Sequence, residues 1–132
     1  MDVSREMLNV SRRRAAKLSI DVWFLIADVQ ALPFRNNNFD TVVSSLSTCT
    51  FPNPVAALEE MARVCRVGGK ILLLEHGRSD HERLGRWQDR HADKFAEPLG
   101  CHWNNEPLEL ARNAGLKVLR SRQSFFRNCF AS

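Results

Sequence analysis

Several polar side chains in this sequence stand where they could together hold a small polar ligand. Asp2 directly precedes an amphipathic segment, Asp28 ends the apolar run VWFLIA, and Ser44 and Ser45 end a second run. A carboxylate such as Asp2 can accept both hydroxyl hydrogens of a ribose, and Asp28, beside the apolar Val29, suits the amino group of an adenine ring. Each aspartate could also be only a helix cap or a turn residue. Their order along the chain is what favours a nucleoside site.

Predicted strands would position these groups. Residues 22–27 and 70–75 are short, continuous apolar runs, typical of strands that are buried on both faces, and residues 39–45 give another strand. A last strand is predicted over residues 116–122. Because ligands of open parallel sheets bind outside the carboxyl ends of the strands, the polar groups would meet at one edge. The pattern predicts an α/β domain around a parallel sheet.

Predicted helices alternate with these strands. They span about residues 4–18, 54–66 and 107–115, because N-cap residues precede them and glycines follow the last two. In the second helix, Glu59 and Arg63 can pair across one turn. The caps and stops of the first two helices are Ser4, Asn53, Pro54, Gly68 and Gly69.

The stretch from Gly77 to Gly100 breaks this alternation. It is rich in Arg and His, yet its large side chains, among them Trp87 and Phe95, recur near helical spacing. We expect an insertion over residues 77–105 that lies over the edge of the sheet, on the substrate side. Trp87, Phe95 and Trp103 could form an apolar lid there, or they could simply pack the insertion onto the sheet.

Length and charge narrow the class of protein. The 132 residues suffice for one compact domain, and no apolar run approaches the roughly 18 residues of a membrane helix. The net charge of +4 comes mostly from arginines that we assign to solvated helix faces. The densest basic run, Arg12 to Arg14, has no aromatic residues interleaved with it. We therefore expect no nucleic-acid partner.

The cysteines indicate a reducing compartment. They lie far apart and include no Cys-x-x-Cys pair, which fits reduced thiols in an intracellular protein, cytoplasmic or mitochondrial. Cys101 with His102, and His76 with His81, lack the paired spacing of a structural zinc site. We therefore expect no metal.

Five segments in the order seen here carry a resemblance to a known family. The chain resembles the methyltransferases of ubiquinone and menaquinone biosynthesis, which are class I enzymes that depend on S-adenosylmethionine. A later part, with EHGRS, HAD and GCHWN, resembles a mitochondrial methyltransferase-like branch, so that nearly the whole chain is covered. The five segments are DVSREML (2–8), ADVQALPF (27–34), FDTVV (39–43), LEEMARVCRVGGK (58–70) and ILLLEH (71–76).

The resemblance implies methyl transfer from S-adenosylmethionine to a small or lipophilic acceptor, such as a quinone-like molecule, a lipid or a thiol. Peripheral contact with a membrane would suit such an acceptor. The resemblance implies that Asp2 holds the ribose hydroxyls of the cofactor and that Ser44 and Ser45 lie near its methionine part. The residues carried over to the adenine ring are Val3, Met7, Asp28 and Val29.

Two histidines are candidates for the base that deprotonates the acceptor. His76 follows the predicted strand 70–75 and would face the pocket, and His102 is the second candidate. Either could instead be a loop histidine bonded to backbone. Because the sulfonium donor is already activated, alignment of the acceptor can supply about 7–11 kcal/mol of the barrier reduction.

The sequence departs from the family at its start. The first strand and the glycine-rich loop that normally precede these segments are missing, and the final antiparallel strand, from Phe125, is short. We expect an incomplete Rossmann-like, three-layer αβα fold over residues 1–132, a partial methyltransferase domain. With the family's strand order 3-2-1-4-5-7-6, the strands 22–27 and 39–45 would lie about 14 Å apart, at about 4.8 Å per strand. Free strand edges would then favour self-association, and cofactor binding would be poor.

Two other classes of function fit parts of this sequence. A non-catalytic interaction module, or a partial gene product, would keep the half-fold and its exposed edges without activity. A nicotinamide-dependent dehydrogenase also places an acidic residue after a second strand. The Leu-Pro-Phe that follows Asp28 and the Gly-Gly before residues 70–75 argue against the dehydrogenase.

Overall fold

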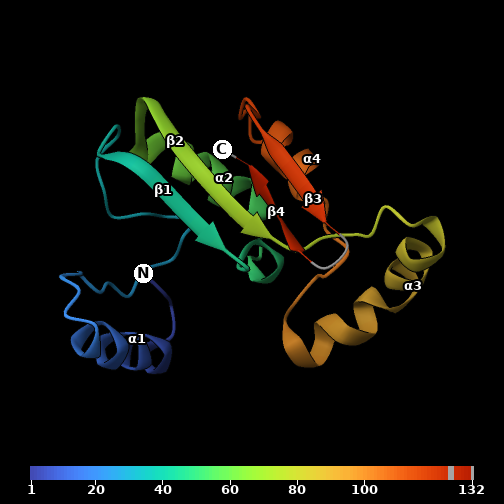
Figure 1. Cartoon of the computed structure of the whole chain (residues 1–132), viewed down its shortest axis with the longest axis horizontal. Helices are drawn as coiled ribbons and strands as arrows, with labels where there is room; N and C mark the ends of the chain where they lie inside the picture. Colours follow the sequence, from blue (N-terminus) through green and yellow to red (C-terminus); the bar gives the residue numbers. More distant parts are fainter. Residues whose placement is uncertain (125–126, 132) are drawn as a thin grey trace.

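The computed structural model describes residues 1–124 and 127–131, with side chains at all of these except 95, 98, 99, 123, 124 and 127–131. Helices and strands alternate along most of the chain (Figure 1). The elements are α1 (Arg5–Lys17), β1 (Phe39–Ser45), the 3-10 helix η1 (Thr48–Thr50), α2 (Pro54–Val64), β2 (Cys65–Glu75), α3 (Glu82–Leu99), α4 (Pro107–Asn113), β3 (Ser121–Ser124) and β4 (Arg127–Ala131).

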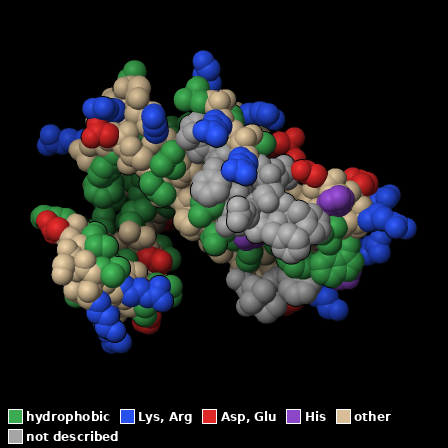
Figure 2. Space-filling view, viewed as in Figure 1, with side chains coloured by type: hydrophobic (Ala, Val, Ile, Leu, Met, Phe, Trp, Pro, Cys, Tyr) green, Lys and Arg blue, Asp and Glu red, His purple; other side chains and the backbone are tan. Residues whose placement is uncertain are grey.

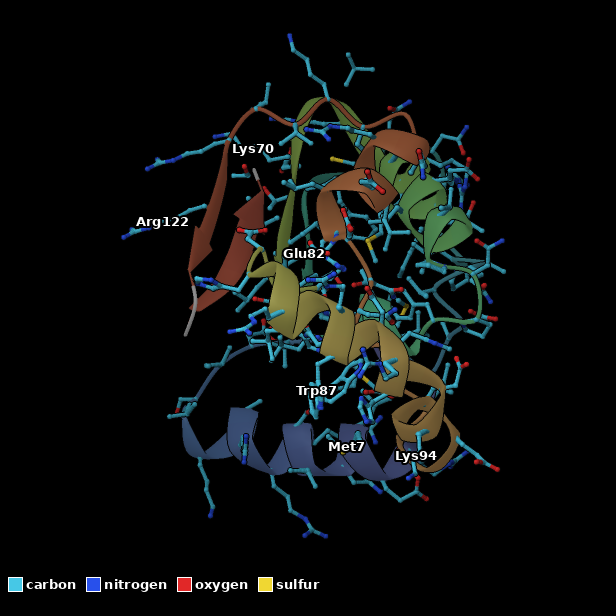
Figure 3. The ribbon with its side chains drawn as sticks, turned by 90° about the vertical axis from the view of Figure 1, so that its right-hand side faces the viewer. Met7, Lys70, Glu82, Trp87, Lys94 and Arg122 are labelled. Atoms are coloured by element: carbon cyan, nitrogen blue, oxygen red, sulfur yellow. The ribbon has the colours of Figure 1, made fainter. Side chains whose placement is uncertain are left out.

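The sheet has the order β1-β2-β4-β3. β1 and β2 are parallel, and β4 is antiparallel to both of its neighbours. This arrangement reproduces the 4-5-7-6 end of the expected strand order, and it confirms the α/β class. Helices α2 and α4 cover one face of the sheet, whereas α1 stands apart from it (Figures 1 and 3).

The hydrophobic core lies between β2 and the α2–α4 layer. Its fully buried members are Leu58 and Met61 of α2, Leu73 of β2 and Ala111 of α4. Each large apolar side chain buried in this way stabilises the fold by about 1.5–3 kcal/mol. The core therefore holds β2 firmly at the centre of the sheet.

The second predicted helix is confirmed, with one correction at its end. Asn53 caps α2 by accepting a hydrogen bond from the backbone nitrogen of Ala56 at 3.1 Å. The helix does not run to the glycines: it ends at Val64, and residues 65–69 already belong to the irregular start of β2. Phe39 pairs with residue 65 and Thr41 with residue 70, so the four residues between loop out of the ladder. The loop is possible because Gly68 adopts a φ of 77°.

In the N-terminal region the predicted helix is confirmed, but the predicted strand is wrong. Ser4 caps α1 through the nitrogen of Met7 at 3.2 Å, as expected. The run 22–27 forms no strand; a single parallel bridge joins Ile26 to Asp2. A strand buried on both faces needs neighbours on both edges and faces, and here Trp23 is 95% exposed. Within the described residues, no strand pairs with the outer edge of β1, so the two predicted strands stay apart.

The predicted strand 116–122 is also shifted. Hydrogen-bonded pairing with β4 begins at Ser121, which lies opposite Ala131, and residues 116–120 are not part of the strand. The predicted start of the final strand at Phe125 lies outside the described residues.

The insertion is helical, as its periodicity predicted. α3 lies beyond the carboxyl ends of β1 and β2 rather than across an edge of the sheet (Figure 1). It ends at Gly100, whose φ of 61° suits a left-handed C-cap. Among the described residues, no helix is both long enough and apolar enough to cross a membrane.

Candidate functional site

A cavity of about 490 Å³ opens at the carboxyl end of β1. One wall is N-terminal and consists of Met1–Val3 and Ala27–Val29. The opposite wall consists of Val43–Ser47, Thr50–Pro52 and Met61. Figure 2 shows the hollow between the N-terminal part of the chain, which includes this wall, and the sheet, with apolar side chains in its depth. The volume lies within the range of about 300–1,000 Å³ that is usual for small-molecule sites.

Six of the seven predicted cofactor-binding residues line this cavity. The exception is Met7, which lies on the first turn of α1 and is exposed. The lining residues are Asp2, Val3, Asp28, Val29, Ser44 and Ser45. These six residues thus line one cavity, and their roles are a matter for the proposal below.

The two aspartates each stabilise a local turn with one carboxylate oxygen. Oδ1 of Asp2 accepts the backbone N–H of Ser4 at 2.8 Å, and Oδ1 of Asp28 accepts that of Gln30 at 2.9 Å. Asp2 and Ile26 are also joined through their backbones, with the nitrogen of Asp2 3.2 Å from the oxygen of Leu25. Each carboxylate thus acts as a turn residue, and among the described residues its second oxygen accepts no hydrogen bond.

A charged clamp ties the loop after Asp28 to helix α2. Oε2 of Glu60 accepts the backbone N–H of Leu32 at 2.8 Å, and Arg63 donates to the backbone oxygens of Leu32 and Phe34 at 3.0 and 2.8 Å. The hydrogen bond from Arg63 lowers the pKa of Glu60 to about 2. The prediction that Arg63 pairs with Glu59 is wrong, because Glu60 is the partner, at 2.6 Å.

A buried carboxylate organises the opposite wall. Glu75 is 1% exposed and accepts hydrogen bonds from the Ser44 hydroxyl at 2.9 Å and from the backbone nitrogens of Ser47 and Thr48 at 3.1 and 3.2 Å. These bonds fix the turn between β1 and η1. The hydroxyl hydrogen of Ser44 is thereby used within the protein, whereas Ser45 is exposed to the cavity. No local pattern pointed to this role of Glu75, which was identified only as the end of a predicted apolar strand.

Neither of the two predicted catalytic histidines lines the cavity. Nε2 of His76 is 3.5 Å from Sγ of Cys101. His102 is exposed, and its backbone nitrogen donates to the oxygen of Cys49 at 2.8 Å. Cys49, His76 and Cys101 form a cluster whose ligand atoms all lie within 4.8 Å of one another. Burial raises the pKa of the Cys49 thiol to about 12, and the hydrogen bond with Cys101 acts in the same direction.

Sequence reasoning missed this cluster. It considered only pairs that are close in sequence, such as Cys101 with His102, whereas the cluster joins three separate loops. The only available signal was that each of the three residues directly follows, or lies within a few residues of, the end of a predicted element.

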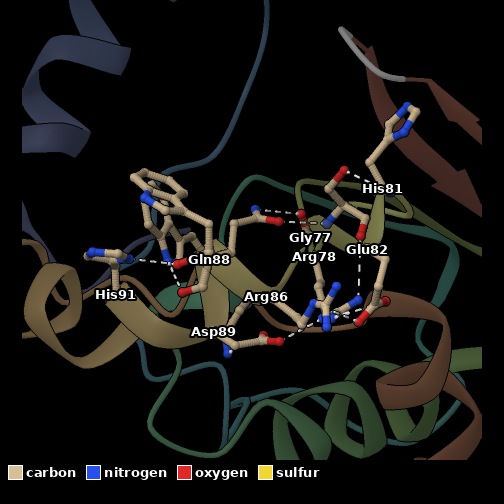
Figure 4. Close-up of polar contacts among 12 residues, drawn as sticks. Gly77, Arg78, His81, Glu82, Arg86, Gln88, Asp89 and His91 are labelled. Atoms are coloured by element: carbon tan, nitrogen blue, oxygen red, sulfur yellow. Dashed lines mark hydrogen bonds and ion pairs between the residues drawn. The ribbon is translucent and has the colours of Figure 1, made fainter. Parts of the chain in front are cut away.

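An aromatic group lies on the insertion. The Trp87 ring is 5.4 Å from the Trp103 ring and 4.9 Å from the His91 ring, centroid to centroid. Nε1 of Trp103 donates to the backbone oxygen of Gln88 at 3.3 Å, and Arg78 forms an ion pair with Asp89 at 3.0 Å. Figure 4 shows how these polar contacts fasten α3 to the segment that follows β2. The side chain of Phe95, the third predicted lid residue, lies outside those described.

A second cavity, of about 480 Å³, lies between the amino-terminal half of β2 and residues 116–119. It is at the opposite end of β2 from the polar groups described above, and none of the predicted site residues lines it. The first cavity is therefore the better candidate for chemistry.

Comparisons with known proteins converge on one description. Residues 1–73, which include every residue that lines the first cavity, match the family model described as "Methyltransferase domain". The chain is 28% identical over 86 residues to the mitochondrial methyltransferase OMS1 of Saccharomyces cerevisiae, covering 65% of this chain and 18% of that protein. It is 35% identical over 101 residues to the ubiquinone/menaquinone biosynthesis C-methyltransferase UbiE of Coxiella burnetii, covering 75% and 40%. The chain thus spans less than half the length of these curated relatives.

Solved structures share the fold. The YcgJ protein of Bacillus subtilis superposes with a TM-score of 0.75 at 22% identity, over 92% of this chain and 52% of that chain. A SAM-dependent methyltransferase of Aquifex aeolicus superposes with a TM-score of 0.70 at 18% identity, over 98% and 63%. At these identities the likeness establishes the Rossmann-like architecture.

Proposed function

This chain belongs to the methyltransferase domain family, and from that premise we propose that its first cavity holds S-adenosylmethionine for methyl transfer to a small or lipophilic acceptor. The observation that supports the proposal is the pair of carboxylates, Asp2 and Asp28, which face the same cavity. Both keep one oxygen outside their turn hydrogen bonds. Such a pair suits the ribose hydroxyls and the adenine amino group of one nucleoside.

In this proposal each wall holds one part of the cofactor. Asp2 accepts from the ribose hydroxyls, Asp28 accepts from the adenine amino group, and Val3 and Val29 contact the ring. Ser45 lies toward the methionine part. Ser44 supports that end indirectly, because its hydroxyl is bonded to Glu75. For Met7 to reach the adenine ring, α1 would have to move toward the cavity.

In this reaction the protein mainly has to position the cofactor and the acceptor. The cofactor supplies an activated methyl group on a sulfonium sulfur, so alignment of the acceptor nucleophile contributes most of the catalysis. We propose His76 as the base that takes the proton of the acceptor, with His102 as the second candidate; a base of this kind contributes about 10²–10⁴-fold. Trp87 and Trp103 offer an apolar surface beside them for the acceptor.

The acceptor class and the compartment are part of the proposal. Similarity to UbiE favours a quinone-like acceptor over a lipid or a thiol, and similarity to OMS1 favours mitochondria. An apolar acceptor of this kind would bring the exposed Trp87 close to a membrane surface.

The cofactor is expected to bind the chain weakly, with a dissociation constant above the micromolar range. The N-terminal wall joins the rest of the molecule through few hydrogen bonds, and ordering it on binding costs free energy. Ligand-observed NMR, which measures weak binding, tests the site directly. Asp2→Asn and Asp28→Asn should each weaken binding about 10- to 100-fold, because each removes an ionic hydrogen bond.

Asp21→Asn is the matched control, since Asp21 is an exposed carboxylate of the same region that does not line the cavity. Equal affinity of all three variants and the unmodified chain would remove the basis of the proposal.

A second candidate function is a non-catalytic interaction module. It is favoured by the outer edge of β1, with which no described strand pairs and where Val43 is 66% exposed. A methyl-transfer assay with quinone precursors or small thiols separates the two, because an interaction module transfers no methyl group.

A further inference from the structure

Three potential metal ligands meet at the carboxyl ends of β1 and β2. Cys49 belongs to η1, which follows β1; His76 directly follows β2; and Cys101 directly follows the C-cap of α3. Their ligand atoms lie within 4.8 Å of one another. The fold thus brings two thiols and one imidazole together from positions 25 or more residues apart.

The spacing of these atoms suits a tetrahedral zinc ion. With Zn–S bonds of about 2.3 Å and Zn–N bonds of about 2.0–2.1 Å, adjacent ligand atoms of a tetrahedron lie about 3.6–3.8 Å apart. Nε2 of His76 and Sγ of Cys101 are already 3.5 Å apart. A zinc ion would therefore require only small side-chain movements to complete the three bonds.

A buried carboxylate lies beside the cluster. The carboxylate of Glu75 is buried next to the cluster, within electrostatic reach of Cys49. It accepts three hydrogen bonds from neutral donors, yet among the ion pairs of the described residues none involves Glu75. Two thiolates balance the charge of Zn²⁺, so the bound ion would add no net charge beside this buried carboxylate, and the site has to be judged on the geometry of its ligands.

We propose that Cys49, His76 and Cys101 bind one Zn²⁺ through two thiolates and Nε2 of the imidazole, with the fourth position open to water. Thiolate and imidazole ligands select zinc over the hard cations Mg²⁺ and Ca²⁺. Three protein ligands with an open position are typical of zinc sites that act on a ligand rather than only on folding. The cluster adjoins the cavity, because Thr50 of the same 3-10 helix lines it.

Zinc binding does not depend on the methyl-transfer proposal. It rests on the three ligand atoms alone, and it can be measured with metal and no cofactor. It does bear on the choice of base. In the zinc-bound chain Nε2 of His76 cannot accept a proton, which leaves His102 for that role.

The test uses the full chain, reduced and freed of metal by a chelator. Titration with Co²⁺ should give one equivalent of binding, a thiolate-to-cobalt charge-transfer band and the strong visible bands of tetrahedral cobalt, and Zn²⁺ should displace them. Cys101→Ser and His76→Gln should each lower the Zn²⁺ affinity by more than about 10- to 100-fold, the cost usual for lesser changes around a zinc site. Cys65→Ser, which removes a buried thiol bonded to the backbone oxygen of Lys70, should leave it unchanged.

X-ray absorption of the zinc-loaded, unmodified chain keeps the proposal testable should a variant fail to fold. Two sulfurs at about 2.3 Å and one nitrogen at about 2.0–2.1 Å are expected. A reduced chain without the charge-transfer band, a zinc shell of oxygens only, or an equal loss of affinity in Cys65→Ser would each overturn it.

Discussion

The two walls of the first cavity differ in how they are built. The wall formed by β1, η1 and α2 is continuous with the hydrophobic core, and the buried Glu75 fixes its turn through three hydrogen bonds. The two segments of the N-terminal wall are joined to each other by the bridge between Asp2 and Ile26. The loop after Asp28 is attached to α2 by the clamp of Glu60 and Arg63 and by Gln30, whose Oε1 accepts the backbone N–H of Asn53 at 2.8 Å. Met1 and Val3 of this wall are 51% and 70% exposed, whereas Val29 packs against the edge of the core.

The wall that stabilises the fold is therefore not the wall that is proposed to recognise the ligand. The carboxylates proposed to hold the nucleoside lie on the weakly supported wall, and the core lies behind the other wall. Segments with few buried contacts open at low free energy, whereas core elements open only with the whole domain. Ligand binding should therefore order the N-terminal wall, and unfolding should report almost entirely on the other.

The largest expected effect comes from the core. Leu58→Ala should lower the free energy of unfolding by about 2–5 kcal/mol, because it leaves a cavity beside Met61 and Leu73. Val3→Ala, on the N-terminal wall, should change it by less than about 0.5 kcal/mol. Urea unfolding followed by far-UV circular dichroism measures both. Similar losses of unfolding free energy in the two variants would mean that both walls contribute to stability to the same extent.

The loop clamp, which joins the walls, should have an intermediate effect that depends on pH. Because the folded-state pKa of Glu60 is lowered from 4.5 to about 2, its ionised form stabilises the fold at pH values above about 4.5. The contribution is lost as the pH falls from 4.5 toward 2. Glu60→Gln should therefore cost about 1 kcal/mol at pH 7, after allowance for solvent screening, and progressively less in acid.

Urea unfolding of both chains at several pH values measures this difference. Glu59→Gln is the matched control, since Glu59 is exposed and forms none of the clamp's hydrogen bonds. A Glu60→Gln deficit that stays constant down to pH 2 would contradict the role given to its charge.

Local signals in the sequence predicted much of this structure. The caps Ser4 and Asn53 were identified because a cap depends on residues only a turn away. Six of the fifteen residues that line the first cavity were also among the predicted site residues. Of these, Ser44 and Ser45 end a parallel strand as expected, whereas Asp28 follows a run that forms no strand. The sheet order followed from the family resemblance.

Features that depend on distant partners were not predictable in the same way. The run 22–27 has the composition of a buried strand, yet it forms none, because composition does not supply the neighbouring strands that would bury it. The choice of Glu60 over Glu59 as the partner of Arg63 is decided by the loop at Leu32, which both Glu60 and Arg63 contact. The cluster of Cys49, His76 and Cys101 depends on three loops whose meeting no spacing rule describes.

The smallest expected effect comes from the helix caps. The same kind of cap occurs on α1, which follows the N-terminal wall, and on α2, which belongs to the opposite wall, so the two helices can be compared directly. Ser4 caps α1 and Asn53 caps α2, each through one hydrogen bond from the third residue beyond it, at 3.2 and 3.1 Å. Loss of such a cap usually costs about 1 kcal/mol of helix stability. In Asn53→Ala this cost should appear in global unfolding, because α2 is part of the core. In Ser4→Ala it should not, because α1 can fray while the core stays folded.

Hydrogen exchange resolves the two cases. Amides of α1 should exchange about 5-fold faster in Ser4→Ala, the factor that corresponds to about 1 kcal/mol, with no change in α2. In Asn53→Ala, protection should fall in α2 and β2 together. Because the cap bond is alike in both helices, any difference in response reports on how far each helix is coupled to the core. Equal coupling would mean that α1 unfolds only with the sheet, and the N-terminal wall would then be as firmly built as the wall it faces.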